Sequence, residues 1–536
     1  MVIVPQTNII LLKTPMELDD DNQLTFANKT AQFNYFSNLP KLELDDSTYQ
    51  RKEGIIRYPT NSTTTYEDLI QYNYCMYQNE AYDSKWFYAY ITEINYINDG
   101  MSTIKLETDV FQTWQFDLEY KASFVEREHV NDDTIGKHTI PEGLETGEYI
   151  CNSSTSDLTL SGYNAHISFI IGATTYPNLD EAKDSSSGSD IYNGIYSGVK
   201  YFRYDTTGAT DGILDIYAKA GKVDSITGIF MIPQWLAPLK EGTTYREVAT
   251  STTPQQYQFN VNKVFSLDSY TPKNNKLKCF PYSYLLVSNN VGQNNILHYE
   301  KFSDNSQCTF FVQGCLCAGG SVALVPINYN NVVSNFNESI SLGKYPICNY
   351  TTDMYTNWLT QNSINVLGNT LTTDDLNLAS SITSSTIGAI TSGATGNMAG
   401  VGLSLGSGLL GIADSLIAKK QHNMISPATN GNLNCGDIVN STGRNTFNFY
   451  NMSIKREYAK IIDEYFSMYG YKVNEVKVPN ITGRTNWNYV KTIGCNILGN
   501  IPQIDMQKIR NLFDKGITFW HNPNTFLDYS QTNSIV

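Results

Sequence analysis

The sequence has few charged residues for its length, and most of them are acidic. Only 17% of its 536 residues are Asp, Glu, Lys or Arg, and the net charge is -15. No cluster of Lys and Arg occurs, and a DNA-binding protein uses such clusters to displace counterions from phosphates. This argues against binding nucleic acid as the main task. An acidic chain is equally compatible with an ordinary soluble protein or with a conduit that surrounds DNA without binding it.

The sequence also lacks the usual metal, disulfide and secretion signals. Its nine cysteines include no C-x-x-C pair, and Cys315-x-Cys317 has no histidine near it. We therefore expect free thiols in a reducing cytoplasm, and neither a metal nor a cofactor. The first residues, MVIVPQTNIILLKTPMELDDD, lack a basic region and a cleavage site, so we expect no secretion signal.

Two short enzyme motifs occur, but each lacks the context that its chemistry needs. Residues 402–406 read G-x-S-x-G, and residues 406–411 read G-x-G-x-x-G. The first motif needs a downstream acid and histidine, yet only His422 and His521 follow, both in polar surroundings. The second needs a following parallel strand, which the sequence does not offer. Chance matches in a Gly- and Ser-rich stretch explain both.

Two charged groupings near residue 130 have the residue types of a catalytic or a metal site. Glu126 and Glu128 are two apart on an expected strand, which puts them on one face, about 7 Å apart, a spacing that would suit glycosidase carboxylates. An exposed, charged strand face explains them better. His129 and His138 flank Asp132 and Asp133, and a solvated loop is the favoured explanation over a metal site.

Aromatic and β-branched residues fill much of the space that charges leave, and they favour strands. The segment KWFYAYITEINYINDGMSTIKLETDV predicts a hairpin with its turn at Asn98-Asp99-Gly100. Further strands are expected within 165–174, 228–236, 283–290 and 308–327, while FQTWQFDL suits a short helix or an irregular bridge. The fold class is therefore mainly β with minor α, built from several barrel-like or sandwich-like domains.

Two helices are expected near the C-terminus. Residues 453–473 predict a helix with Tyr458, Ile461, Ile462 and Tyr465 on one face. Residues 505–516 predict a second, with an apolar face of Ile509, Leu512 and Phe513 and with Gly516 as its C-cap.

The most unusual segment, residues 376–413, contains no Asp, Glu, Lys, Arg or His over 38 residues. Eight of them are glycine, and Asp374, Asp375, Lys419 and Lys420 flank the segment. Its large apolar residues are Leu376, Leu378, Ile382, Ile387, Ile390, Met398, Val401, Leu403, Leu405, Leu409, Leu410 and Ile412.

These apolar residues need a dry environment. Each gains about 1.5–3 kcal/mol on full burial, whereas each glycine costs a helix about 1 kcal/mol. Burial therefore outweighs the glycine cost, and a solvated linker is excluded. As a helix the segment would reach about 57 Å, nearly two membrane crossings. Gly396 with Gly400, and Gly402 with Gly406, would let helices approach closely in lipid. Membrane insertion and burial in an oligomer core both remain open on these grounds.

Several long motifs resemble the tail-knob, or distal-tail-tube, proteins of small short-tailed bacteriophages of the phi-twenty-nine group, which infect Gram-positive hosts. The motifs are TNIILLKTP, KWFYAYITEINY, ETDVFQTWQFDLEYKASFVEREHV, YFSMYGYKVN and NYVKTIGCNILGNIPQIDMQKIRNLFDKGITFWH. They lie at both ends of the chain, and residues 150–350 carry no matching motif.

The resemblance implies a non-enzymatic virion protein, made in the host cytoplasm, that forms a homohexameric tube at the end of the tail. Tube or collar proteins would adjoin it above and a tip protein below. A hydrophobic loop, here residues 376–413, would plug the lumen and then insert in the host cytoplasmic membrane. Viral DNA would pass through the lumen without specific binding, and no cofactor is implied.

The same resemblance divides the chain into five consecutive ranges. These are a tube-wall domain (1–135), a β-rich middle domain (136–235), a second β domain (236–360), the hydrophobic loop (361–422) and a C-terminal segment that completes the wall (423–536). Two other functions stay open: a receptor-binding tail protein whose exposed, Tyr-rich middle region holds host glycans, and a cell-wall-degrading tail enzyme.

Overall fold

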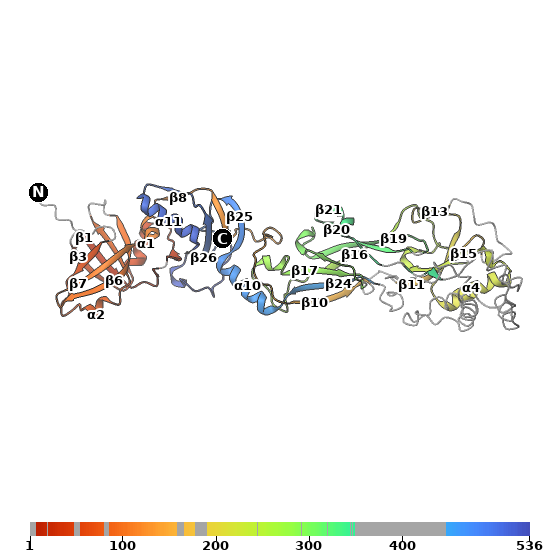
Figure 1. The fold of residues 1–536 in the computed structure, drawn as a ribbon, viewed down its shortest axis with the longest axis horizontal. Coiled ribbons are helices and arrows are strands. Elements are labelled where there is room, and N and C mark those ends of the chain that lie inside the picture. The colour runs from red at the N-terminus through yellow and green to blue at the C-terminus, as the bar shows by residue number, and fades with distance from the viewer. Residues whose placement is uncertain are drawn as a thin grey trace, which may run out of the picture. The chain divides into compact units, whose positions relative to one another are not determined.

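A computed structural model describes residues 7–18, 20–47, 54–79, 85–157, 166–176, 190–243, 245–290, 292–318, 320–342, 345, 347–348 and 446–536. Strands outweigh helices in these residues and form curled sheets, which confirms the mainly β fold class. The chain forms two compact units, and each gathers segments that are distant in sequence (Figure 1). Unit 1 is Met1–Gly147, Tyr270–Leu277 and Arg456–Val536, and unit 2 is Glu148–Ser269 and Lys278–Lys455. The five ranges expected from the sequence stay a prediction.

The predicted hairpin lies in the six-stranded sheet of unit 1, whose strand order is β3-β1-β5-β6-β7-β4. Strands β6 (Trp86–Asn98) and β7 (Met101–Thr108) pair antiparallel, and Asn98 lies opposite Met101 across the turn, which confirms the prediction. Both faces of β6 are buried from Phe87 to Tyr90, because one face joins the core of this sheet and the other packs toward Trp487 and Trp520. The other strands are β1 (Thr7–Leu12), β3 (Lys41–Ser47), β4 (Ile55–Tyr58) and β5 (Tyr74–Asn79).

A five-stranded sheet joins the two ends of the chain within unit 1. Its order is β2 (Asn22–Leu24), β28 (Ile517–Trp520), β26 (Trp487–Ile493), β9 (Ser123–Glu128) and β25 (Tyr471–Lys477). Strand β9 thus lies between two C-terminal strands, as its orange ribbon between blue ones shows in Figure 1. Neither end of the chain can complete this sheet alone.

Short elements of unit 1 complete its outer layers. The segment FQTWQFDL begins with helix α3 (Val110–Trp114). Helix α11 (Gln503–Lys515) confirms the second predicted helix: Ile509 and Phe513 are buried, Leu512 is half-buried, and Gly516 is the C-cap with φ 106°. The remaining elements are α1 (Lys29–Ser37), α2 (Tyr66–Leu69), β8 (Leu118–Tyr120) and β27 (Ile497–Gly499).

Helix α10 (Arg456–Tyr469) corrects the other helix prediction. It begins later than expected because strand β24 (Asn448–Ile454) occupies the preceding residues. The predicted face is partly confirmed: Ile462 is buried and Tyr458 and Tyr465 are half-buried, but Ile461 is 66% exposed and Asp463 is buried instead. The buried residues are Ala459, Ile462, Asp463 and Phe466. A pattern that counts only apolar residues cannot place a carboxylate inside, so it did not predict the burial of Asp463.

Unit 2 contains three larger sheets around one main core. The sheet β10 (Tyr149–Ser156), β24, β17 (Ser283–Ser288), β18 (Asn294–Leu297) faces the sheet β16 (Gln255–Asn262), β19 (Gln307–Gly314), β20 (Val322–Tyr329), β21 (Val332–Ser334). Phe259, Phe310 and Phe449 meet between them, with ring centroids 5.3–6.0 Å apart. These strands confirm the predicted runs at 283–290 and 308–327.

The third sheet of unit 2 is β14 (Lys200–Tyr204), β11 (Ile167–Ala173), β15 (Ile226–Pro233), β23 (Ile347–Cys348). The predicted strands at 165–174 and 228–236 are β11 and β15. Helix α4 (Thr207–Lys219), which the sequence analysis missed, packs Ile213, Leu214 and Tyr217 against one face. The small elements are β12 (Asp190–Tyr192), β13 (Ile195–Ser197) and β22 (Ile340–Ser341).

The tyrosines of unit 2 contribute more to the core than to the surface. Tyr192, Tyr217, Tyr299 and Tyr329 are among the largest fully buried side chains. Tyr196, at 73% exposed, is an exception. These four residues are therefore not placed to contact a glycan at the surface, and the receptor-binding alternative stays a prediction.

Residues 270–277 are a short excursion of the chain: they belong to unit 1, whereas the residues on both sides of them belong to unit 2. Asp463 holds this excursion in place. Its Oδ2 accepts hydrogen bonds from the Tyr270 hydroxyl and the Lys273 amide, both at 2.7 Å. Its Oδ1 accepts from the amide and the side chain of Asn274, at 3.0 and 2.8 Å. A second carboxylate, Glu142, pairs with Arg127 and with Lys276 of the same excursion.

We expect Asp463→Ala to destabilise unit 1 by about 2–4 kcal/mol, because four hydrogen-bonding groups of residues 270–274 lose their acceptor. Amide hydrogen exchange in residues 270–277 should speed up, which mass spectrometry would measure alongside denaturant unfolding. Glu464→Ala, at the exposed neighbouring position, is the matched control and should change stability by less than about 0.5 kcal/mol. Equal effects of the two substitutions would contradict this role.

Candidate functional site

The predicted hydrophobic loop lies outside the described residues, but both strands that bracket it are described. All twelve apolar residues and four charged flanks of the prediction fall within 349–445. Upstream, β23 adds two residues to the edge of β15. Downstream, β24 pairs with β10 on one side and β17 on the other. In the part of the chain that the structure describes, no helix is long and apolar enough to cross a membrane.

The chain that follows the predicted loop is hydrogen-bonded to unit 2 from its first described residue, Thr446. The Phe447 amide donates to Asp157 Oδ1 at 3.2 Å, and the Asp157 amide donates to the Phe447 carbonyl at 3.1 Å. Asn290 Nδ2 donates to the Thr446 carbonyl at 3.0 Å. Phe447 and Phe449 are completely buried. From Thr446 onward the chain is thus anchored in the core of unit 2.

Glu126 and Glu128 do not form the paired carboxylates of a glycosidase. A β-bulge on β9 shifts its register with β26 between Arg127 and Val125, so the simple alternation of faces fails. Glu128 is fully buried, where it pairs with Lys477 at 2.5 Å and accepts from the Asn480 amide at 2.9 Å. Glu126 pairs with Lys491 at 2.9 Å. The expected exposed strand face is wrong for Glu128.

His129 is a structural residue and not part of a solvated loop. Its Nδ1 accepts from the Tyr489 amide at 2.7 Å, which leaves Nε2 to donate to the Ser467 carbonyl at 3.1 Å. Burial lowers the pKa of His129 to about 3, so the ring is neutral. Asp132 caps its own turn through Thr134, and Asp133 accepts from the Tyr471 hydroxyl at 2.7 Å.

Metal-binding and triad chemistry also find no support in the described ranges. No group of three or more His, Cys, Asp and Glu is placed there to hold a metal ion. The seven described cysteines, Cys75, Cys151, Cys279, Cys308, Cys315, Cys317 and Cys495, are free thiols, as predicted. His521 is held between Thr25 at 2.8 Å and Asn488 at 3.0 Å, and burial lowers its pKa to about 4. His422 and the two glycine motifs lie outside the described residues.

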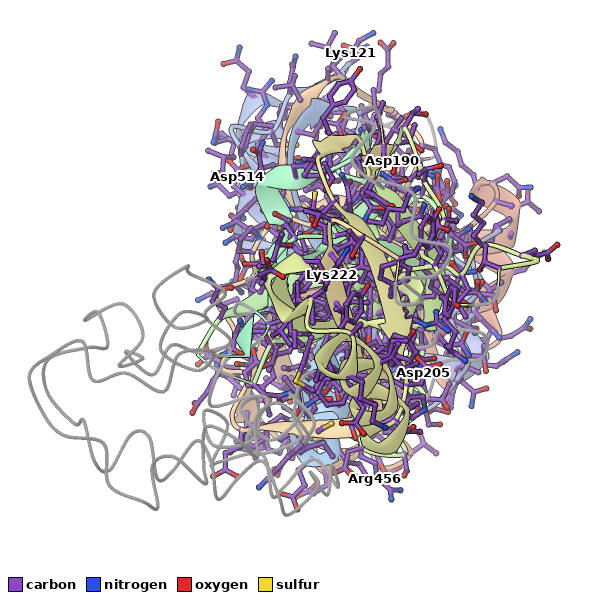
Figure 2. The ribbon with its side chains drawn as sticks, turned by 90° about the vertical axis from the view of Figure 1, so that its right-hand side faces the viewer. Lys121, Asp190, Asp205, Lys222, Arg456 and Asp514 are labelled. Atoms are coloured by element: carbon purple, nitrogen blue, oxygen red, sulfur yellow. The ribbon has the colours of Figure 1, made fainter. Side chains whose placement is uncertain are left out.

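Several basic side chains of unit 2 occur in ion pairs. Asp205 pairs with Arg203 at 3.0 Å and with Arg246. Lys200 lies 3.1 Å from Asp190 and 3.3 Å from Glu247. Figure 2 labels Asp190 and Asp205 among these side chains. These ion pairs neutralise the cations, so they are poorly suited to bind the phosphates of DNA.

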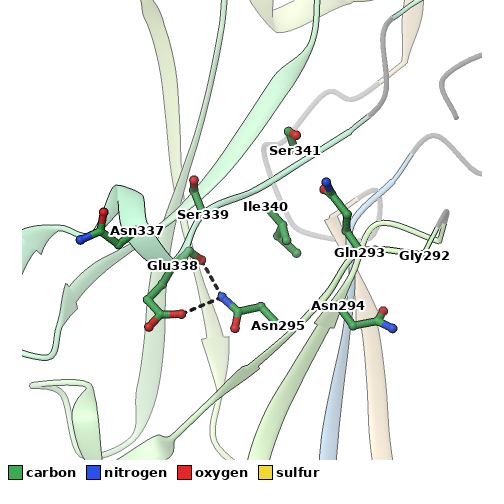
Figure 3. Close-up of a pocket in the computed structure, with 9 residues that line it drawn as sticks. All are labelled: Gly292, Gln293, Asn294, Asn295, Asn337, Glu338, Ser339, Ile340 and Ser341. Atoms are coloured by element: carbon green, nitrogen blue, oxygen red, sulfur yellow. Dashed lines mark hydrogen bonds between the residues drawn. The ribbon is translucent and has the colours of Figure 1, made fainter. Parts of the chain in front are cut away.

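Unit 2 also contains a polar pocket, which the sequence analysis missed (Figure 3). Its cavity is about 420 Å³. Two stretches that are about 45 residues apart form it, and its lining is Gly292, Gln293, Asn294, Asn295, Asn337, Glu338, Ser339, Ile340 and Ser341. No sequence motif joins these stretches, so only the fold shows them together.

The family model of the C-terminal domain of tail knob protein gp9 from Bacillus phage phi29 matches residues 243–534, more than half of the chain. This chain belongs to the phi29 tail knob family. A model of the N-terminus of caudoviral major tail proteins also matches residues 5–119. The chain is therefore a structural component of a phage tail and not an enzyme, as predicted.

Similar tail knob proteins align over nearly their whole length. The chain is 26% identical to tail knob protein gp9 of Bacillus phage B103, over 98% of each chain. It is also 26% identical to gp9 of Bacillus phage phi29, over 99% of this chain and 98% of that one. The structure of tail knob protein gp12 of bacteriophage C1 has the same fold, with a TM-score of 0.68 at 15% identity, covering 99% of this chain and 100% of that one.

The neutral His129 should make this tail knob protein lose stability in acid. An unfolded histidine titrates near 6.5, so protonation below that pH favours unfolding. The contribution of His129 is complete above pH 6.5 and is lost as pH falls toward its folded pKa of about 3. We expect His129→Gln to reduce the slope of unfolding free energy between pH 6 and 4 by up to about 1.4 kcal/mol per pH unit. Denaturant titrations at each pH measure it, and an unchanged slope would refute this assignment.

Proposed function

We propose that this tail knob protein forms the distal tube of the tail as a homohexamer. In this proposal the loop at 376–413 plugs the lumen and then inserts in the host cytoplasmic membrane. The observation that carries the proposal is an uncharged stretch of 38 residues between two strands of one folded unit. Such a stretch needs one dry environment before infection and another after it, and a closed tube followed by a bilayer supplies both.

The anchoring of β24 supports a loop that acts while its unit stays folded. The hydrogen bonds at Thr446 and Phe447 tie the downstream end to Asn290 and Asp157. A segment held in this way delivers its apolar residues to a membrane without unfolding the sheet that holds it. Adjacent tail proteins, collar above and tip below, would complete the assembly.

The charge balance supports a channel for DNA. A net charge of -15 and the paired cations of unit 2 give phosphates little to bind. Like charge keeps a passing genome from adhering to the tube, so DNA would be a cargo and not a ligand.

Replacing Leu405 and Leu409 with Asp should abolish leakage of dye from liposomes, because two charges at the centre of a bilayer cost several kcal/mol. Assembly of the tail should remain, as electron microscopy of particles would show. Ile461→Asp is the matched control: it adds charge at an exposed apolar position of α10 and should leave leakage unchanged.

Two results would separate the membrane role from its alternatives. Full leakage by the Leu405/Leu409 double variant would overturn membrane insertion by this loop. Failure of the double variant to assemble would instead favour burial of the segment in an oligomer core. Deletion of 376–413 should also remove leakage while leaving unit 1 folded.

A further inference from the structure

The polar pocket of unit 2 is held open by bonds between its own walls. Asn295 Nδ2 donates to the backbone carbonyl of Glu338 at 2.8 Å and to its carboxylate at 3.1 Å, as the dashed lines in Figure 3 show. Asn289 Nδ2 donates to the Ser341 carbonyl at 2.8 Å, and the Gln293 amide donates to Asn289 Oδ1 at 3.1 Å. Both walls are thus fixed before any ligand arrives, which lowers the ordering cost of binding.

The lining of the pocket selects a class of ligand. It offers amides that both donate and accept, together with hydroxyls and one carboxylate, but no Lys, Arg or His. A phosphate or other anion would meet Glu338 with no cation to balance it. A wholly apolar ligand would leave these polar groups unpaired, which costs free energy. A neutral molecule with many hydroxyl groups meets neither penalty.

One apolar side chain joins these polar groups in the lining. Ile340 points toward the space between the two walls in Figure 3, next to Gln293 and Asn295, with 7% of its surface exposed. Hydroxyl-bearing rings present both polar edges and C–H faces, so they match a polar lining that includes one apolar side chain.

We propose that this pocket binds a neutral carbohydrate. Gln293 and the neighbouring amides hydrogen bond to its hydroxyls, and the Glu338 carboxylate oxygen that Asn295 does not bond accepts a hydrogen bond from a further hydroxyl. The cavity of about 420 Å³ takes one or two sugar rings. Such a shallow site binds weakly, and repetition of the chain in a tail would raise its avidity. The pocket lining includes none of residues 376–413, so the test of carbohydrate binding is independent of the test of the membrane role.

The test is binding of the full-length protein to an array of neutral oligosaccharides of N-acetylglucosamine, N-acetylgalactosamine, rhamnose and glucose, with glycerol phosphate oligomers as the charged comparison. We expect at least one neutral glycan to bind, with its Kd confirmed by titration in solution. Gln293→Ala should weaken that binding about tenfold, as loss of one or two hydrogen bonds does. Glu338→Gln, which keeps the shape of the wall, should weaken it as well.

Asn262→Ala is the matched control, since Asn262 is an exposed amide of unit 2 that bonds Gln307 and lies outside the pocket lining. It should leave glycan binding unchanged, and liposome leakage should be unchanged in all three variants. The proposal is overturned if no neutral glycan binds, or if the control weakens binding as much as Gln293→Ala. It is also overturned if only the glycerol phosphate oligomers bind.

Discussion

The fold of unit 1 depends on the hydrogen-bond donors and cations that reach its buried carboxylates. A buried carboxylate that lacks hydrogen-bond donors costs several kcal/mol. Asp463 finds its donors in residues 270–274, which arrive from a distant part of the chain. This requirement sets the inner face of α10 and fixes the excursion at 270–277, while Glu142 adds the pairing with Arg127 and Lys276. These hydrogen bonds and ion pairs therefore fix the middle segment, residues 270–277, in unit 1.

Local pattern predicted those elements whose signals are local. The hairpin of β6 and β7 has an Asp-Gly turn between alternating strands, and α11 ends at a glycine with φ 106°. The burial of Asp463 on α10 was not predicted because its hydrogen-bond donors lie about 190 positions away in the sequence. Burial of Glu128 was missed because the bulge in β9 changes which way side chains point. Helix α4 was missed because Gly208 and Gly212 weaken its helical signal.

The candidate sites differ in the same way: a local signal could be predicted from the sequence, and a non-local one could not. The hydrophobic loop was predicted because the absence of charge is visible along the sequence itself. The polar pocket was invisible there, since Asn and Gln are abundant throughout and its two walls come from separate strands. His129 illustrates a further limit, because a histidine among polar neighbours in sequence is buried by Tyr489 and Ser467 from the other end of the chain. Composition can thus predict a continuous functional segment. A site whose side chains come from distant parts of the sequence becomes visible only in the folded structure.

The two strands that bracket residues 349–445 differ in mechanical strength. Strand β24 is central in its sheet, and tension along it would load two full ladders of hydrogen bonds in shear, all at once. Strand β23 is two residues long and pairs on one side only. Any pulling force on the intervening chain would therefore detach the upstream end first. Under tension the chain would therefore be released at residue 348 before residue 446. The order in which the two ends of the segment detach is set by the lengths and positions of their strands.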